Sequence, residues 1–374
     1  MKIAITGAKG LLGWHTSARI HARNCAAKFA GSAAPFELVE IDRTCFEDQQ
    51  CLIKALDSVE GIIHFAGVNR GEDSEVEAAN PAISAKLIDA CKQAGINPTI
   101  VYANSTHAAN DTPYGRSKRL AGEALESFTE KYVNLILPHI FGEQAKPYYN
   151  NVTATLIDKL HLGETPEINA NGAVSLLHAG DAADIALDAV LSKKHGTISP
   201  VSHSISIAEL YEKLKGFHAL YHEQNIYPNV TDKFDLALFN CYRSAGFPDK
   251  YPTPLKVNKD SRGILFESSK GGCGGQTFMS TTVPGVTRGD HFHLEKVERF
   301  LVVRGQAVIR LRKVLTDELF EFTVSGDEPV AIDMIPLYTH SIENIGEEEL
   351  YTLFWTHEMF DPNAPDTYAD PVLK

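Results

Sequence analysis

One stretch near the C-terminal end limits the folds open to this chain more than any other. Residues 285–305 read GVTRGDHFHLEKVERFLVVRG, in which one residue separates His291 from His293 and Glu298 follows soon after. Side chains alternate between the two faces of a β-strand, so both imidazoles should point to the same side. Two imidazoles and a carboxylate can bind a divalent metal, and His340 in a later strand is the best-placed fourth ligand. The stretch therefore predicts a metal site built on β-strands, and the alternative is that these are surface strand residues.

The spacing of this stretch resembles the first motif of the cupin family of small β-barrels. The matching residues are Gly285, His291, His293, Glu298 and Gly305. The second cupin motif matches at Pro336, His340 and Asn344, with Leu337 where a glycine is usual. The resemblance implies an all-β cupin barrel that holds Zn²⁺ through the four predicted ligands. The metal could take part in the chemistry or could only stabilise the barrel.

A second constraint lies at the start of the sequence, where an apolar strand runs into glycines. Residues 2–6 read KIAIT, and Gly7, Gly10 and Gly13 follow before a predicted helix to about residue 22. Glycines permit a tight turn and a close approach of backbone amides to a pyrophosphate, and the helix N-terminus adds partial positive charge. This context predicts an α/β Rossmann-like fold, a doubly wound parallel sheet that binds a dinucleotide.

The next residues leave the choice between NAD and NADP open. A second predicted strand, residues 36–41, ends in Asp42 and Arg43. An acid there usually binds the ribose hydroxyl of NAD, whereas an arginine can pair with the 2′-phosphate of NADP. Lys9 in the glycine turn also favours a phosphate, so the residues tilt modestly toward NADPH.

After the predicted strand 99–103 come residues that could transfer a proton. Tyr114 and Lys118 lie four residues apart, on one face of a predicted helix. A lysine cation beside a phenol lowers the pKa of the phenol and suits it to proton transfer near neutral pH. Ser105, at the end of the preceding strand, can orient a substrate oxygen. The alternative is a helix that carries a tyrosine and a lysine by chance.

This trio resembles the short-chain dehydrogenase/reductase (SDR) family in its extended, sugar-nucleotide branch. The resemblance implies that Ser105, Tyr114 and Lys118 are catalytic. The loop THAANDTP between Ser105 and Tyr114 is short and lacks the Thr-Asp-Glu set of the 4,6-dehydratases of this branch, which favours a plain ketone reduction. The predicted cofactor-binding residues are Gly7, Lys9, Gly10, Leu11, Leu12, Arg43, Phe65, Ala66, Gly67, Tyr114 and Lys118.

The domain boundary is predicted at residues 246–254, GFPDKYPTP, which hold three prolines. Residues 1–245 are then an NADP-binding SDR reductase domain. Short alternating apolar runs follow one another in residues 255–374 and suggest a barrel or sandwich. The resemblance to known families implies a cupin metal-binding epimerase domain there. Lys146 and Asn151 are further candidates for substrate contacts, with an ordinary loop and helix cap as the alternative.

Together the two halves resemble a family of bifunctional capsular polysaccharide enzymes. The matching motifs are HFAGVNR (64–70), YGRSK (114–118), GDHFH (289–293), FLVVRG (300–305) and MFDPNAPDTY (359–368). The resemblance implies that the cupin domain epimerises a UDP-linked 2-acetamido-2,6-dideoxy-4-hexulose at C3. The SDR domain then reduces the C4 ketone with NADPH to UDP-2-acetamido-2,6-dideoxy-L-talose, on the route to UDP-N-acetyl-L-fucosamine. Tyr338, Lys296 and His357 are candidates for the base of the epimerisation.

Three other functions stay open at this point. The chain could be a monofunctional reductase whose cupin is a dimerisation module, a non-catalytic nucleotide-binding regulator, or a reductase of another 4-keto sugar nucleotide. The proton donor Tyr114 argues against a regulator, which has no use for one.

Composition narrows the partners and the compartment. The formal net charge of −13 disfavours nucleic acid and anionic membranes as partners. The six cysteines form no C-x-x-C pair and suggest no disulfide framework. The sequence opens on a strand rather than a leader, and no apolar run reaches membrane-spanning length. We therefore expect a reduced, cytoplasmic protein. The resemblance given above implies a homodimer that acts on a UDP-linked 4-keto-6-deoxy amino sugar.

Overall fold

The computed structural model describes residues 1–169 and 171–374, and contacts divide the chain into two compact units. Unit 1 comprises Met1–Gly142 and Val174–Ile205, and unit 2 comprises Glu143–Ala173 and Ser206–Lys374. This division differs from the predicted boundary at residues 246–254, because several helices before that boundary pack with the β-rich half. The predicted functional domains remain a prediction.

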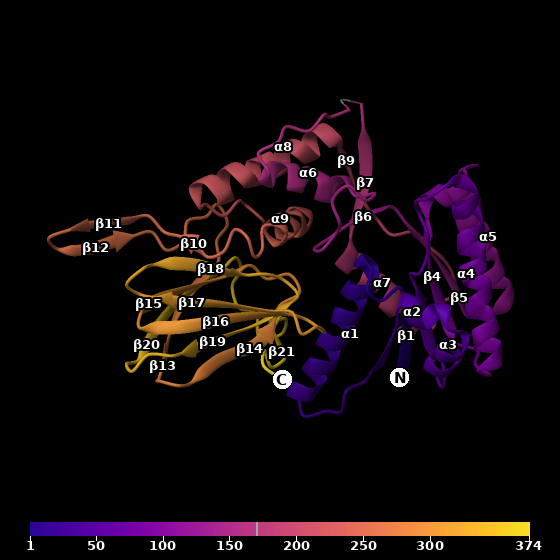
Figure 1. Ribbon diagram of the computed structural model, residues 1–374, viewed down its shortest axis with the longest axis horizontal. Helices are drawn as coiled ribbons and strands as arrows, with labels where there is room; N and C mark the ends of the chain where they lie inside the picture. Colours follow the sequence, from indigo (N-terminus) through magenta and orange to yellow (C-terminus); the bar gives the residue numbers. More distant parts are fainter. Residues whose placement is uncertain (170) are drawn as a thin grey trace. The chain divides into compact units, whose positions relative to one another are not determined.

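Unit 1 is built on a six-stranded parallel sheet in the order β2-β1-β3-β4-β5-β8. Its strands are Lys2–Thr6 (β1), Glu37–Ile41 (β2), Gly61–His64 (β3), Thr99–Ser105 (β4), Tyr132–Leu137 (β5) and Gly196–Ile198 (β8). Strands β1, β4 and β5 of this sheet are labelled in Figure 1. A smaller sheet joins His139–Phe141 (β6), Ala173–His178 (β7) and His203–Ser206 (β9). The large sheet confirms the predicted Rossmann-like fold. Its strand order reverses at β1 and β3, and such sheets bind ligands outside the carboxyl ends of the strands at that point.

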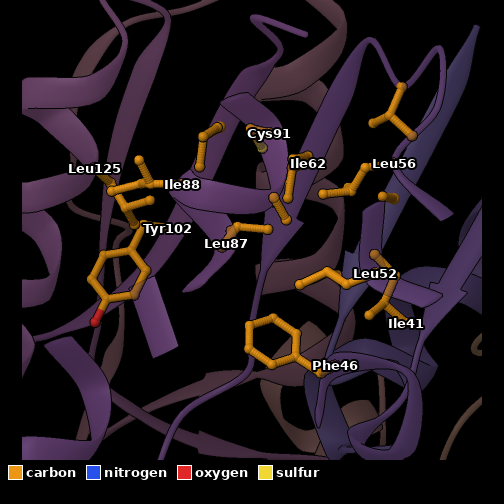
Figure 2. Close-up of a cluster of buried hydrophobic side chains, with 14 of the residues drawn as sticks. Ile41, Phe46, Leu52, Leu56, Ile62, Leu87, Ile88, Cys91, Tyr102 and Leu125 are labelled. Carbon is orange, nitrogen blue, oxygen red and sulfur yellow. The ribbon is translucent and has the colours of Figure 1, made fainter. Parts of the chain in front are cut away.

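Helices cover both faces of this sheet. On one face, Leu11–Phe29 (α1) and Ala179–Leu191 (α7) contribute Ile20 and Leu187 to a fully buried cluster. The other face is covered by Arg43–Glu47 (α2), Gln49–Ala55 (α3), Asp73–Gln93 (α4) and Pro113–Phe128 (α5), and a 3-10 turn, Thr106–Ala109 (η1), precedes α5. Figure 2 shows this second core, in which Leu87 of α4 and Leu125 of α5 pack with Ile62 of the sheet. The two cores keep the sheet rigid beneath its carboxyl edge.

One cysteine pair corrects the expectation of fully reduced cysteines. Cys45 and Cys51 form a disulfide that links α2 to α3. The two short helices bring the Cα atoms to 5.3 Å, within the range that a disulfide spans. Sequence spacing could not show this, because the turn at Asp48 sets the approach of the two helices.

Unit 2 combines helices with two five-stranded antiparallel sheets (Figure 1). The helices are Val152–His161 (α6), Ile207–Phe217 (α8), the π-helical turn His218–Glu223 (η2) and Lys233–Ala245 (α9). One sheet, in the order β10-β18-β15-β20-β13, contains Thr253–Pro254 (β10), Gln276–Thr282 (β13), Glu298–Arg304 (β15), Val330–Met334 (β18) and Leu350–Thr356 (β20). The other, in the order β17-β16-β19-β14-β21, contains Thr287–Phe292 (β14), Gln306–Lys313 (β16), Leu319–Ser325 (β17), Tyr338–Asn344 (β19) and Tyr368–Ala369 (β21). A separate hairpin pairs Val257–Asp260 (β11) with Gly263–Phe266 (β12).

The core of the β-region lies between these two sheets. Phe300 and Ile332 of the first sheet share a buried cluster with Ile309 and Ile342 of the second. The predicted β-rich C-terminal half is thus confirmed. Within the described residues, we find no helix that combines the length and the apolar character needed to cross a membrane.

A buried ion pair ties the helical part of unit 2 to its strands. Arg299 on β15 donates to both carboxylate oxygens of Asp333 on β18, through Nε at 2.6 Å and Nη2 at 3.0 Å. The hydroxyls of Tyr221 and Tyr227 donate to the same carboxylate at 2.6 and 2.7 Å. Burial acts to raise the pKa of Asp333, but the Arg299 charge and these hydrogen bonds hold it below its ordinary value. The carboxylate is therefore ionised, and it joins η2 and the following loop to strands β15 and β18.

We expect Arg299→Met to lower the free energy of unfolding by about 3–5 kcal/mol, because it leaves Asp333 as a buried charge without its cation. Urea unfolding can be followed through the fluorescence of Trp355, whose ring stacks on a tyrosine of this network. The matched control on the same strand is Arg304→Met, which breaks an exposed pair with Glu348 and should cost about 0–1 kcal/mol. Equal losses in the two variants would contradict this prediction.

Candidate dinucleotide and metal sites

The glycine turn after β1 forms a close-packed cradle at the point where the strand order reverses. Gly7 has a φ of +70°, and a Cβ at this residue would lie 3.0 Å from the backbone nitrogen of Ala66. A Cβ at Gly13 would lie 2.2 Å from the Gly7 carbonyl oxygen. Only glycines permit this approach of α1 to the ends of β1 and β3. The turn thus fits the pyrophosphate of a dinucleotide, with Gly10 as the N-cap of α1. Helix α1 begins at Leu11 and ends at Phe29, so it starts before Gly13 and extends beyond the predicted end at about residue 22.

The residues that bear on the choice of nicotinamide cofactor pair with one another. Lys9 Nζ donates to Asp42 Oδ2 at 2.7 Å, while Arg43 Nε donates to Glu47 Oε1 at 2.7 Å. Asp42 also accepts the backbone N–H of Cys45 and so caps α2. That hydrogen bond and the one from Lys9 hold the pKa of Asp42 below its ordinary value. Asp42, Lys9 and Arg43 therefore all lie near the end of β2, so groups that suit NAD and groups that suit NADP are both present there.

Asn80 of α4 is a residue that the sequence reading missed. Its side-chain oxygen accepts the backbone N–H of Val68, and its Nδ2 donates to the Val68 carbonyl and to Ser117 Oγ, all at 2.9 Å. A Cβ at Gly67 would lie 2.8 Å from Asn80 Oδ1. Asn80 thereby fixes the loop after β3, which holds the predicted cofactor residues Phe65, Ala66 and Gly67, against the helix of Tyr114. Helical periodicity in the sequence cannot reveal these contacts, because Val68 and Ser117 belong to other segments of the chain.

The three predicted SDR residues come together at the end of β4 and the start of α5. Tyr114 is hydrogen-bonded to Ser105, the last residue of β4. Lys118 Nζ donates to the Ala103 carbonyl at 2.6 Å and lies 4.2 Å from the centroid of the Tyr102 ring. Burial raises the pKa of Tyr114 above its ordinary value, although the hydrogen bond with Ser105 acts to lower it. This corrects the expected lowering of the Tyr114 pKa by Lys118, because desolvation of the phenol is the largest cause of the shift.

The buried lysine predicts a pH dependence of stability. Burial lowers the pKa of Lys118 from 10.5 to about 7. Between these values the unfolded chain binds the proton and the folded chain does not, so stability rises with pH in this window. We expect the melting temperature of the wild-type protein to rise relative to that of Lys118→Met from about pH 7 to about pH 10. Differential scanning fluorimetry at several pH values tests this, and a constant difference would refute it.

Four predicted metal ligands converge in unit 2. His291 on β14 lies directly across from His340 on β19, and their ring centroids are 4.6 Å apart. Glu298 Oε2, from the start of β15, lies 3.1 Å from His293 Nε2 and 3.5 Å from His340 Nε2. One possible ligand atom from each residue lies within 4.8 Å of the others. Both sheets therefore contribute to one compact cluster of four potential ligands.

The protonation of this cluster suits a divalent cation. Burial, together with the neighbouring His340 and His293, lowers the pKa of His291 to about 3, so its ring is neutral. Burial likewise lowers the pKa of His340. His340 Nδ1 lies 3.3 Å from the Tyr338 carbonyl, while Nε2 is buried and has no hydrogen-bond partner among the described residues. The buried Nε2 of His340 beside the Glu298 carboxylate is therefore better explained by a metal-binding role than by a purely structural one.

The turn before His340 keeps its shape despite the leucine. Leu337 has a φ of +64°, the left-handed conformation that a glycine adopts without strain. Its backbone N–H donates to the His293 carbonyl at 2.8 Å, and its carbonyl accepts the N–H of Val314 at 3.0 Å. Leucine in place of the usual glycine therefore puts backbone strain at Leu337, but His340 still lies in the cluster of potential ligands.

The other candidate residues have partners that suit structural roles. Tyr338 contacts Gln144, Lys296 Nζ donates to the Pro365 carbonyl, and His357 Nδ1 accepts the backbone N–H of Val297. Asn151 caps α6 by accepting the N–H of Ala154, and Lys146 is exposed.

Comparisons with known proteins cover both parts of the chain. The NAD dependent epimerase/dehydratase family matches residues 3–201, and the polysaccharide biosynthesis C-terminal domain matches residues 258–368. The UDP-2-acetamido-2,6-beta-L-arabino-hexul-4-ose reductase of Pseudomonas aeruginosa is 31% identical over 382 aligned residues, covering 100% of this chain and 99% of the relative. The solved structure of the capsular polysaccharide assembling protein CapF from Staphylococcus aureus is 30% identical, with 100% of both chains covered and a TM-score of 0.60. CapF has also been solved with the inhibitor 3-isopropenyl-tropolone, at 29% identity and a TM-score of 0.55.

These matches confirm the predicted resemblance to capsular polysaccharide enzymes over the whole chain. They also indicate an oxidoreductase, in agreement with the paired Ser105 and Tyr114. The chain belongs to the NAD dependent epimerase/dehydratase family, and this membership implies a nicotinamide cofactor.

Proposed function

We propose that this chain is a bifunctional nucleotide-sugar enzyme of capsular polysaccharide synthesis. Its cupin domain epimerises a UDP-linked 2-acetamido-2,6-dideoxy-4-hexulose at C3. Its SDR domain reduces the C4 ketone with NADPH to UDP-2-acetamido-2,6-dideoxy-L-talose, toward UDP-N-acetyl-L-fucosamine. The proposal is carried by the presence on one chain of a Ser105–Tyr114 pair and a three-histidine, one-glutamate cluster. The full-length match to a UDP-sugar reductase supports the substrate class.

In the reductase domain, Tyr114 is the proposed proton donor. Ketone reduction adds a hydride to carbon and a proton to oxygen, and a bound reduced nicotinamide supplies the hydride. Because burial raises its pKa, the Tyr114 phenol is protonated at neutral pH and can give its proton to the new alkoxide. Ser105 holds the ketone oxygen beside this phenol. Lys118, one helical turn later, favours the phenolate that remains.

In the cupin domain, the proposed chemistry is exchange of the proton at C3. That proton is acidic because the enolate formed by its loss is delocalised over the neighbouring C4 ketone. A Zn²⁺ held by His291, His293, Glu298 and His340 would supply Lewis acidity toward a substrate oxygen. Epimerisation is reversible while the ketone persists. Reduction removes the ketone and so draws the first step forward.

NADPH is the proposed cofactor because two cations lie at the end of β2. Lys9 and Arg43 are 82% and 92% exposed, and their partners Asp42 and Glu47 are at least partly exposed. Exposed ion pairs contribute little, so either cation can turn to a 2′-phosphate at small cost.

We also propose a cytoplasmic homodimer. The hairpin β11–β12 exposes Ile264 and Leu265, and the edge strand β13 exposes Phe278 and Met279. Unpaired edge strands with exposed apolar side chains favour association with another chain. Sedimentation velocity measures the mass directly. The cytoplasmic location is supported by the chemistry, since nicotinamide coenzymes and nucleotide sugars are cytoplasmic metabolites.

A second candidate is a monofunctional 4-keto-sugar nucleotide reductase with a structural, dimerising cupin. One observation favours it: Lys296, His357 and Tyr338, the candidates for the epimerisation base, all have partners of a structural kind. Incubating the full chain with the 4-keto UDP-sugar and NADPH separates the two functions. NMR of the product should show an alcohol at C4 with inverted configuration at C3. A product with unchanged C3 would support the second candidate.

A further inference from the structure

We propose that the C-terminal segment 365–370 positions the metal ligands, and that Asp366 is the positioning residue for His293. This inference rests on the metal site proposed above. It concerns a residue outside the four-ligand cluster and far from it in sequence. In this proposal, segment 365–370 keeps the ligand side chains in the orientation that binds the metal.

The backbone carbonyl of Asp366 selects the tautomer of His293. His293 Nδ1 lies 2.5 Å from this carbonyl oxygen. A carbonyl can only accept, so Nδ1 carries a hydrogen and Nε2 is the nitrogen that would bind a metal. His293 Nε2 is the atom that faces Glu298 Oε2 at 3.1 Å. Carbonyls and carboxylates commonly hold metal-binding imidazoles in this way and raise their basicity.

The side chain of Asp366 fixes the position of that carbonyl. Its carboxylate accepts three successive backbone N–H groups, from Leu294 and Glu295 at 2.9 Å and from Lys296 at 2.8 Å. Lys296 Nζ adds a hydrogen bond to the Pro365 carbonyl at 2.6 Å. Asp366 has a φ of +41°, which is uncommon for a residue with a side chain and needs such support. One residue thus clamps the loop directly after His293 and also orients its ring.

The rest of segment 365–370 contacts the two strands that carry His291 and His340. Ala369 of β21 lies across from His291, so β21 extends the sheet beside β14. Asp370 Oδ2 accepts Thr339 Oγ1–H at 2.7 Å, next to His340 on β19, and also Arg312 Nη2–H at 2.7 Å. Segment 365–370 therefore contacts each of the strands or loops that carry the three imidazoles.

The test compares metal affinity in the full-length protein by competition with a chromophoric chelator. We expect Asp366→Ala to weaken Zn²⁺ binding by about 10–100-fold, as outer-shell losses do. Asp361→Ala is the matched control, because Asp361 lies in the same tail, is exposed, and caps only the nearby Asn363 N–H. It should bind Zn²⁺ like the wild-type protein. The visible spectrum of the Co²⁺-substituted protein should change in Asp366→Ala alone, which a merely structural role would not produce.

Asp366→Asn keeps the test decisive if the alanine variant does not fold. Asparagine tolerates positive φ and keeps one acceptor oxygen, so its Zn²⁺ affinity should fall between the wild-type and alanine values. Wild-type affinity and an unchanged Co²⁺ spectrum in a folded Asp366 variant would overturn this inference and leave the metal site standing. A wild-type protein that binds no Zn²⁺ would instead overturn the metal site itself, and the inference with it.

Discussion

Replacing Tyr114 with phenylalanine is expected to slow NADPH-dependent ketone reduction by about 10²–10⁴-fold, the usual contribution of a general acid. The variant removes one hydroxyl and with it the hydrogen bond to Ser105, while the half-buried ring is kept. Deuterium exchange at C3 should continue, because the proposed epimerisation does not use this residue. The rate is measured as loss of NADPH absorbance with the 4-keto UDP-sugar.

A second tyrosine provides a matched control for this prediction. Tyr211 of α8 lies four residues before Lys215, whose Nζ is 5.7 Å from the ring centroid, so it repeats the spacing of Tyr114 and Lys118. Tyr211→Phe should reduce the ketone at the wild-type rate. If Tyr114→Phe also reduced it at that rate, the phenol would not be the proton donor. If a folded Tyr114→Phe lost C3 exchange as well, the two activities would not be separate.

Replacing His291 with alanine is expected to remove both the metal and C3 exchange. The loss of a direct ligand should weaken Zn²⁺ binding by more than the about 10–100-fold that outer-shell changes cost. Elemental analysis after dialysis measures the bound metal, and NMR in heavy water measures exchange. Reduction of a substrate already epimerised at C3 should continue. The control is His195→Ala, at an exposed histidine of unit 1. Stoichiometric zinc in His291→Ala would show that the ligand set is wrong.

The sequence predicts unit 1 well because its signals are local. The apolar strand, the glycine turn and the following helix are consecutive, so Gly7 and Gly13 can be recognised without knowing the fold. Helix α4 also begins with a local signal, since Asp73 and Glu75 lie in its first turn and acids there favour a helix N-terminus. The prediction of a lowered pKa for Tyr114, by contrast, was wrong. Burial is set by the whole unit and cannot be read from the spacing of two residues.

In unit 2 the predicted ligands come together, but much of what holds them was not predictable. The strand expected around His340 is β19, but its burial was not predictable, because His340 and its polar neighbours Thr339 and Ser341 break the apolar alternation although all three are buried. The bulge between Gly289 and His291 depends on pairing with β19, which sequence spacing does not show. Asp366 acts across 70 to 72 residues on the loop after His293. Such contacts depend on tertiary packing and cannot be predicted from the sequence. The spacing of the histidines and the glutamate can be recognised directly in the sequence.

Solvent isotope uptake at C3 of the 4-keto UDP-sugar tests most directly whether one chain holds two separate catalytic centres. The full-length protein is incubated with this substrate in heavy water without NADPH, once loaded with zinc and once after treatment with a chelator, and the sugar is analysed by NMR. We predict deuterium at C3 with the zinc-loaded protein and none after chelation, with the C4 ketone intact in both samples until NADPH is added. A zinc-loaded protein that reduces the ketone with NADPH but never introduces deuterium at C3 would contradict a second centre.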